Sequence, residues 1–252
     1  MKKIPKIYWH IQKKILPNAQ PSQKVYEDCV RNMVNPDVVW LDLGCGHQLF
    51  RSWRERSGAE AEKEIVSRCR FVCGLDYDLD SLKKHRSFKM KLRADISKIP
   101  FVNSSFDLIT SNMVIEHLKN PEEQFSEIYR VLKDNGCFLF HTPNLFSYGT
   151  FFSKLIPDFY KVGLIKALDG REEEDAFKTY YHVNSEKKIF EIAEKTGLSV
   201  HKIGFVTEPV ARFAKFPAIA FFELFFIKIL NINFLRKFRA NIICILKRPE
   251  LE

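Results

Sequence analysis

Three aspartates, Asp42, Asp76 and Asp95, each stand at the end of a short apolar run of the sequence. If these runs are strands of one parallel sheet, their carboxyl ends meet at the edge where such sheets bind ligands. A carboxylate at Asp76 suits the two hydroxyls of a ribose, and one at Asp95 suits the exocyclic amine of adenine, with Ile96 against the ring. Three acids at successive strand ends therefore predict a site for a ligand that contains a nucleoside.

A Gly-Cys-Gly turn, Gly44 to Gly46, follows the first of these acids. Two glycines allow a tight turn and let a ligand lie against the backbone, and the helix after the turn offers free N–H groups. A dinucleotide-binding loop would need a third small residue where the chain has Leu49. A metal site on Cys45 and His47 lacks the further ligands that zinc needs. The turn therefore favours neither a nicotinamide dinucleotide nor a metal ion.

The strands that must position these residues can be read from the apolar runs. Five runs alternate with helical patterns, which indicates a parallel sheet with helices on both faces. Two more runs near the end of the chain have no crossover helix of ordinary length between them. The seven predicted strands are Val38–Asp42, Phe71–Asp76, Leu92–Asp95, Phe106–Ser111, Cys137–Thr142, Leu198–Val206 and Ala240–Lys247.

Two helices have recognisable ends in the sequence. In the first, Asn120 is expected to cap the start, Pro121 suits the first position, and Gly136 follows the end. The second is expected to begin after a Ser185 cap and to stop at Gly197.

Two segments fit the alternation of strands and helices poorly. The long connection after the fifth strand is typical of a lid or a substrate-recognition insertion. Residues 209–235 contain the run FPAIAFFELFFIKIL, which Glu223 and Lys228 interrupt before it reaches the length of a membrane-spanning helix. This run predicts either a buried helix of an enlarged core or an element that lies on a membrane surface.

The chain is expected to form a single domain over residues 1–252. Its parts are a basic N-terminal arm (1–20), a ligand-binding core (21–143), an insertion (144–184) and a C-terminal part (185–252) with the apolar segment 209–235.

The net charge of +9 is concentrated at the two ends of the chain. Residues 1–20 carry five lysines and no acid, and residues 210–252 carry eight basic and three acidic side chains. Such clusters attract anionic lipid or nucleic acid, unless they are only a solvated surface. Because the middle of the chain is nearly neutral, no nucleic-acid partner is expected, and an anionic membrane surface remains an open alternative.

Over about 100 residues the sequence resembles the class I S-adenosylmethionine-dependent methyltransferases, of the type 11-like group related to ubiquinone-pathway small-molecule enzymes. The resemblance implies an α/β, Rossmann-like, doubly wound sheet of seven strands in the order 3-2-1-4-5-7-6, with the last strand antiparallel. The matching pieces are LDLGCG (41–46), GLDYD (74–78), ADISKIPF (94–101), SFDLITSNMVIEHLKNPEEQFSEIYRVLKDNG (105–136) and FLFHTPN (138–144).

The resemblance also implies S-adenosylmethionine as the cofactor and a role for each matching residue. Its methionine end would lie against Asp42 and the turn Gly44-Cys45-Gly46, its ribose at Asp76 and Tyr77, and its adenine at Asp95 and Ile96, while Asn112 and Met113 would border the methyl-transfer face. The chain departs from the family at Gln48, where a third glycine is common, and in the long interval between Gly46 and Asp76. Met113 stands where some relatives have an acid that helps hold a metal, so no metal is expected.

The function that the resemblance implies is methyl transfer to a small-molecule or a lipid- or glycan-linked acceptor, with oxygen as the favoured atom. An oxygen acceptor usually loses a proton, and His117, His141 and His182 are the candidate bases. The alternative is a non-catalytic, membrane-associated protein of the same fold that binds S-adenosylmethionine. The expected location is the cytoplasm, with a peripheral position on the inner membrane face left open, as are the acceptor and the oligomeric state.

Overall fold

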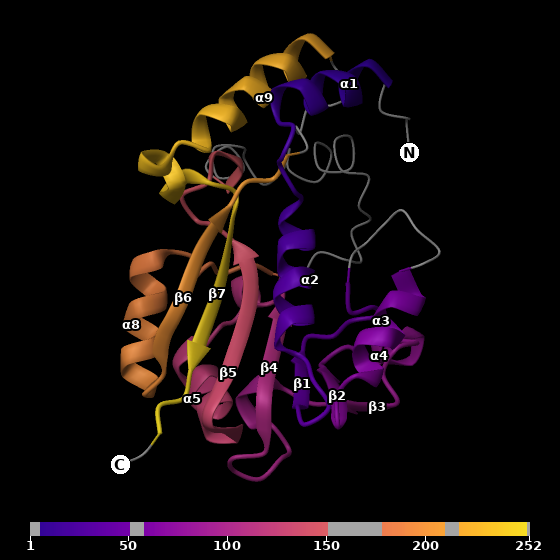
Figure 1. The fold of residues 1–252 in the computed structure, drawn as a ribbon. Helices are drawn as coiled ribbons and strands as arrows, with labels where there is room; N and C mark the ends of the chain where they lie inside the picture. Colours follow the sequence, from indigo (N-terminus) through magenta and orange to yellow (C-terminus); the bar gives the residue numbers. More distant parts are fainter. Residues whose placement is uncertain (1–5, 51–57, 151–177, 210–216, 251–252) are drawn as a thin grey trace. The chain divides into compact units, whose positions relative to one another are not determined.

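A single seven-stranded mixed sheet has the order β3-β2-β1-β4-β5-β7-β6, as the resemblance implied (Figure 1). The computed structural model describes residues 6–50, 58–150, 178–209 and 217–250. The strands β1 to β5 pair in parallel, so that Asp42 lies opposite Gly74 of β2 and Asn112 of β4 lies opposite His141 of β5. The strands are β1 Val39–Leu43, β2 Phe71–Asp76, β3 Met90–Arg93, β4 Phe106–Asn112, β5 Leu132–Pro143, β6 Ser199–Val206 and β7 Asn241–Lys247.

Helices connect these strands and also precede them. The helix α8 begins after Ser185, whose hydroxyl accepts a hydrogen bond from the Lys188 N–H, and it ends at Gly197 with φ +79°, as predicted. The helices are α1 Lys6–Ile15, α2 Ser22–Met33, α3 Gly58–Ser67, α4 Leu79–Lys84, α5 Pro121–Val131, α8 Glu186–Thr196 and α9 Pro217–Leu230, with the 3-10 turns η1 Ile96–Lys98, η2 Ile115–His117 and η4 Asn233–Phe238.

The end of α5 differs from the prediction. The helix stops at Val131, and Gly136 lies inside β5 instead of after the helix. The register between β4 and β5 shifts there, because Phe106 pairs with Leu132 whereas Leu108 pairs with Cys137. The extra residues of β5 bulge out of the ladder, and a Cβ on Gly136 would come within 2.7 Å of the Lys133 carbonyl oxygen.

Two smaller predictions at element ends were also wrong. Asn120 precedes α5 but makes no side-chain cap hydrogen bond, so Pro121 and the two glutamates that follow it remain as the start signals. The third strand runs over Met90–Arg93, two residues earlier than expected. Asp95 therefore lies beyond the strand, where its side chain accepts a hydrogen bond of 2.8 Å from the Ser97 N–H and starts η1.

The chain divides into two compact units, which are described separately. One comprises Gln23–Thr142, Thr179–Gly204 and Ile243–Glu252 and holds most of the sheet. Its core is aromatic: the buried rings of Phe125 on α5 and Phe138 on β5 meet edge to face at 5.7 Å. Burial of such rings stabilises this layer.

The other unit comprises Met1–Ser22, Pro143–Lys178 and Phe205–Ile242. Within it α1 and α9 pack side by side (Figure 1). Their shared core contains Tyr8 and Leu16 from α1 and the segment after it, and Ala220, Leu224 and Ile227 from α9. The apolar run of α9 is thus buried on one face and exposed on the other. Residues 151–177 of the predicted insertion (144–184), which include the charged run REEED at Arg171–Asp175, lie outside the described residues.

Candidate functional site

The turn after β1 has a left-handed backbone conformation at both of its glycines. Gly44 has φ +66° and Gly46 has φ +54°. The Gly44 N–H donates a hydrogen bond of 2.8 Å to the Leu75 carbonyl oxygen, which ties the turn to β2. A Cβ on Gly44 would lie only 2.3 Å from Cγ2 of Val114, whereas a Cβ on Gly46 would meet nothing within 4 Å. Gly44 is therefore needed for close packing, and Gly46 leaves open space above the turn.

Asp76, the last residue of β2, joins this turn through its side chain. Its Oδ2 accepts a hydrogen bond of 2.7 Å from the Gly46 N–H, and its Oδ1 accepts one of 2.8 Å from the Asp78 N–H. The sequence predicted that the strands before Gly46 and at Asp76 end at the same edge of the sheet, and the structure brings these two residues into direct contact. Each carboxylate oxygen keeps further acceptor capacity for a ligand hydroxyl.

The underside of the turn is tightly packed. A Cβ on Gly74 would lie 2.8 Å from Sγ of Cys45 and 2.5 Å from Cδ2 of Phe88. Burial, followed by the nearby charge of Asp42, raises the pKa of the Cys45 thiol. The thiol is therefore a neutral packing group, and Cys45 would meet a ligand through its backbone.

Asp42 lies in β1 beneath the turn and is almost fully buried. The Thr110 hydroxyl donates to its carboxylate, and the Trp40 indole N–H donates in turn to Thr110 at 2.7 Å. Burial raises the pKa of Asp42 to about 8, the Thr110 hydrogen bond lowers it, and the charges of Asp76 and Glu62 raise it. A cationic ligand group beside Asp42 would offset this desolvation and restore its charge.

The predicted adenine and ribose contacts lie at the exposed rim of the same sheet edge. Asp95 is exposed, Ile96 is half-buried, and Tyr77 follows Asp76 with 68% of its surface exposed. The Arg93 guanidinium lies 5.7 Å from the centroid of the Tyr77 ring, and its Nε donates to the Tyr77 carbonyl oxygen at 3.1 Å. These side chains are thus placed to contact a ligand from the solvent side.

Asn112 is the last residue of β4, the strand next to β1, and Met113 follows it. Met113 has φ +58°, an unusual value for a residue other than glycine, and its N–H donates to the His141 carbonyl oxygen at 2.8 Å. Strain of this kind is often found beside functional sites, where the surrounding structure maintains it. The strained turn sets the direction in which Met113 leaves the sheet.

His141, one of the three candidate bases, has no exposed surface. Its Nδ1 lies 2.9 Å from Oδ1 of Asn112, and its ring stacks on Tyr26 with centroids 5.6 Å apart. Burial lowers the pKa of His141 to about 3. The ring is therefore neutral at ordinary pH and enclosed, whereas a base must reach its acceptor.

The other two candidate bases lie on segments that a shared contact brings together. The Glu116 carbonyl oxygen accepts hydrogen bonds from the N–H groups of Tyr180, at 2.7 Å, and Tyr181, at 3.2 Å. His117 is adjacent to Glu116 and half-buried, and His182 is exposed with its ring 5.6 Å from that of Tyr180. The structure thus places the segments of His117 and His182 side by side.

Sequence reasoning missed a buried polar cluster beneath these segments. The Thr142 hydroxyl donates to Oε2 of Glu116 at 3.0 Å and accepts from Nδ2 of Asn184 at 2.7 Å. Glu116, Thr142 and Asn184 are all buried. The one signal in the sequence is the adjacent pair Glu116-His117, directly after the predicted fourth strand.

Residues 41–140 match the family described as "Methyltransferase domain". The chain is similar to a Mycolicibacterium smegmatis protein named a "probable S-adenosylmethionine-dependent methyltransferase", with 31% identity over 123 residues, or 48% of this chain and 43% of that one. It is also similar to the malonyl-[acyl-carrier protein] O-methyltransferase of Legionella pneumophila, with 32% identity over 108 residues, or 40% of this chain and 35% of that one. The chain therefore spans less than half the length of these two relatives.

A solved structure shows the likeness of the fold over most of the chain. The geranyl diphosphate C-methyltransferase of Streptomyces coelicolor aligns with a TM-score of 0.53 and 16% identity, covering 90% of this chain and 76% of that one.

Proposed function

This chain carries a class I S-adenosylmethionine-dependent methyltransferase domain of type 11, and from this premise we propose that it transfers the methyl group of S-adenosylmethionine to an acceptor oxygen. The observation that supports the proposal best is the hydrogen bond between the Gly46 N–H and Asp76, which joins the glycine turn to the carboxylate of β2. A turn fixed in this way presents its backbone and a carboxylate to one ligand at the same time.

The donor set of this edge fits each part of the cofactor. Asp42, with its pKa raised to about 8 by burial, would gain most from the α-ammonium of the methionine end, since a positive charge restores its ionised form. Asp76 would accept the ribose hydroxyls, and Asp95 the adenine amine, with Ile96 against the ring. Among the described residues, no group of three or more His, Cys, Asp or Glu side chains is placed to hold a metal ion.

The cofactor supplies an activated methyl group, and the protein aligns the acceptor and excludes water. Asn112 and Met113 would border the transfer position. We infer that His117 or His182, whose segments meet at Glu116, removes the acceptor proton, because His141 is enclosed and keeps a low pKa. His141 would instead position Asn112 through the contact of its Nδ1.

The acceptor that we propose is linked to a lipid or glycan and is reached at an anionic membrane surface on the cytoplasmic side. The exposed face of α9 supports this proposal, because 73% of Phe222 and 53% of Phe225 are exposed. Such a row of aromatic side chains is costly in water and typical of an element that lies in a membrane interface. Lys13 and Lys14 of α1, in the same unit, are exposed and basic.

The Legionella relative suggests a different acceptor, an acyl group on a carrier protein, methylated at oxygen. No described helix has both the length and the apolar content to cross a membrane. The remaining alternative is a protein that binds the cofactor at a membrane without turnover, and formation of S-adenosylhomocysteine with any acceptor would eliminate it.

Calorimetry with S-adenosylmethionine and S-adenosylhomocysteine tests the central proposal. We expect both to bind the wild-type protein, and Asp76→Ala to weaken binding about 10- to 100-fold, as loss of charge-assisted hydrogen bonds does. Asp80→Ala, on the exposed surface of α4, is the matched control. Absence of binding by the wild-type protein would refute the proposal. Incubation of lipid extracts, glycan extracts and malonyl carrier protein with labelled cofactor then identifies the acceptor class.

Pelleting with vesicles tests the membrane part on its own. The wild-type protein should pellet with vesicles that contain phosphatidylglycerol and not with pure phosphatidylcholine. The pair Phe222→Ser and Phe225→Ser should remain in the supernatant, whereas Phe190→Ser, on the exposed side of α8, should behave as wild type. Equal pelleting of all three proteins would contradict membrane contact by α9.

A further inference from the structure

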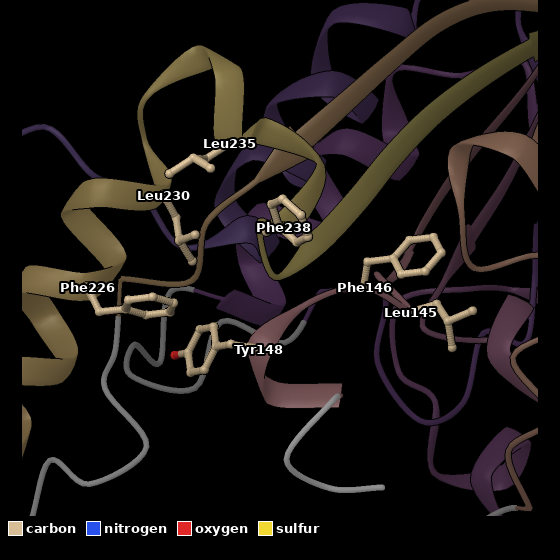
Figure 2. A pocket seen from close by; sticks show the side chains of 7 residues that line it. All are labelled: Leu145, Phe146, Tyr148, Phe226, Leu230, Leu235 and Phe238. Carbon is tan, nitrogen blue, oxygen red and sulfur yellow. The ribbon is translucent and has the colours of Figure 1, made fainter.

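We propose that a cavity in the unit of α9 binds the hydrocarbon chain of the methyl acceptor, an inference that rests on the proposed function and narrows its substrate class. The cavity has a volume of about 390 Å³, within the range of small-molecule sites (Figure 2). Its lining residues are Leu145, Phe146, Tyr148, Phe226, Leu230, Leu235 and Phe238.

The lining offers a ligand almost no polar partner. Six of the seven side chains are hydrocarbon, and the seventh, Tyr148, directs its hydroxyl to Oε1 of Glu223 at 3.0 Å. The Tyr148 ring meets Phe226 edge to face with centroids 5.5 Å apart, and Figure 2 shows the two rings opposite each other. A polar ligand would lose its hydration here without compensation, whereas a hydrocarbon chain would gain from burial.

Buried polar groups behind the lining hold the walls of the cavity in place. Nδ2 of Asn144 donates to the carbonyl oxygens of Lys237 and Arg239, both at 2.8 Å, and its Oδ1 accepts from the Phe146 N–H at 3.1 Å. Asn144 has no exposed surface. One side chain thus joins the wall after β5 to the wall formed by η4.

Arg239 fixes the end of α9 in the same way. Its guanidinium donates to the carbonyl oxygens of Leu230, at 3.0 Å, and Asn231, at 2.8 Å. Leu230 at the end of α9 and Phe238 at the end of η4 both line the cavity. The backbone at the end of α9 accepts hydrogen bonds from Arg239, and the backbone at the end of η4 accepts them from Asn144. The cavity is therefore a pre-formed site and does not have to be opened by the ligand.

The covalent chain keeps this cavity near the proposed transfer site. Leu145 follows Pro143, the last residue of β5, after a single residue, and His141 pairs with Asn112 at the carboxyl end of β4. Four peptide links limit the Cα distance between His141 and Leu145 to about 15 Å, whatever the arrangement of the two units.

Three of the lining rings are also exposed to solvent. Phe226 of α9 is 44% exposed, Phe238 of η4 is 49% exposed, and Phe146 is 57% exposed. Exposed Phe222 and Phe225 continue this surface along α9. An apolar chain therefore meets aromatic side chains on its way into the cavity, which suits entry from a lipid surface better than entry from water.

Binding of n-alkyl maltosides, from octyl to tetradecyl and below their micelle concentrations, tests the proposal by calorimetry. Affinity should rise about fourfold per added methylene, as burial of a methylene predicts, and then reach a plateau when the cavity is full. Leu235→Trp, which fills part of the cavity, should shift the plateau to shorter chains and weaken dodecyl maltoside at least tenfold. Phe190→Ala, on the exposed side of α8 and outside the cavity, should leave both the affinity and the plateau unchanged.

The same proteins separate this inference from the proposed function. If wild type and Leu235→Trp bind S-adenosylmethionine equally, the variant is folded and only the cavity is under test. Affinity that is independent of chain length, or that Leu235→Trp does not alter, would overturn the inference. Sedimentation at the same protein and maltoside concentrations should show that the mass of the protein does not change when the maltoside binds. A fall in mass would mean that the maltoside displaces a second copy of the chain, and the cavity would then be a site of self-association.

Discussion

The Oδ1 of Asn112 lies 2.9 Å from the Nδ1 of His141, and these two residues also pair across β4 and β5. Because an amide oxygen only accepts, the contact requires the proton on Nδ1. The arrangement fixes the tautomer of the histidine and the rotamer of Asn112 together. A residue first considered as a base is thus placed to position its neighbour.

The low pKa of His141 should make the protein less stable in acid. Burial lowers this pKa to about 3, below the ordinary value of 6.5, so the unfolded chain binds the proton more readily. The contribution of His141 to stability is present above about pH 6.5 and is lost as the pH falls towards 3. In urea unfolding at pH 7.5 and pH 5, wild type should lose more stability than His141→Gln. Parallel losses would show that His141 is not responsible.

Asp42 should have the opposite effect on the pH dependence of stability and favour the folded protein at low pH. Burial raises its pKa to about 8, above the ordinary 3.8, so its contribution is present below about pH 4 and is lost as the pH rises to 8. Asp42→Asn should flatten this slope in the free protein. Because a cationic ligand restores the charge, binding of S-adenosylmethionine at pH 7 should release a proton. Calorimetry in two buffers of different ionisation enthalpy detects this release, which Asp42→Asn should abolish.

Gly44→Ala should destabilise the protein more than Gly46→Ala. Both positions have positive φ, which costs an alanine about 1 kcal/mol, but only at Gly44 would the methyl group strike Val114. We expect a difference of about 1–3 kcal/mol between the two variants in chemical unfolding. The double variant Gly44→Ala, Val114→Ala should recover the part of the lost unfolding free energy that comes from the clash with Val114. If it does not, the clash is not the cause of the difference.

Thr142→Val should disturb the segment that carries His182. The variant removes the hydrogen bonds of Thr142 with Glu116 and Asn184 while keeping the shape of the side chain. Stability should fall by about 1–3 kcal/mol, and Thr142→Ser, which keeps the hydroxyl, should lose less. If His182 or His117 is the base, kcat should fall for Thr142→Val at unchanged affinity for S-adenosylmethionine. An unchanged kcat would indicate a purely structural cluster.

The strands that carry the site were predictable from the sequence, because buried parallel strands are short apolar runs. The bounds of β2 were predicted without error, and those of β1 and β4 within one residue. The end of α5 and the start of β5 were not predictable, because they depend on the register shift between Phe106 and Leu108. A shift of register is a property of two strands and leaves little trace in either one.

The candidate site shows the same division. The strand ends that carry the Gly44–Gly46 turn and Asp76 were expected at the same edge of the sheet, but the hydrogen bond between Gly46 and Asp76 was not predicted. The cluster of Glu116, Thr142 and Asn184 was missed because its members are far apart in sequence and unremarkable singly. For α9, the apolar run alone could not separate its buried face from its exposed face, since that division depends on packing against Tyr8 and Leu16.

The close packing among Gly74, Cys45 and Phe88 has a consequence for how this turn diverges. A side chain at position 74 would meet both neighbours at once, so it becomes acceptable only when both the thiol of Cys45 and the ring of Phe88 are replaced by smaller groups or move away. The three positions should therefore covary among related chains. The ligand-binding side of the turn can therefore stay the same while the three packing residues beneath it change together.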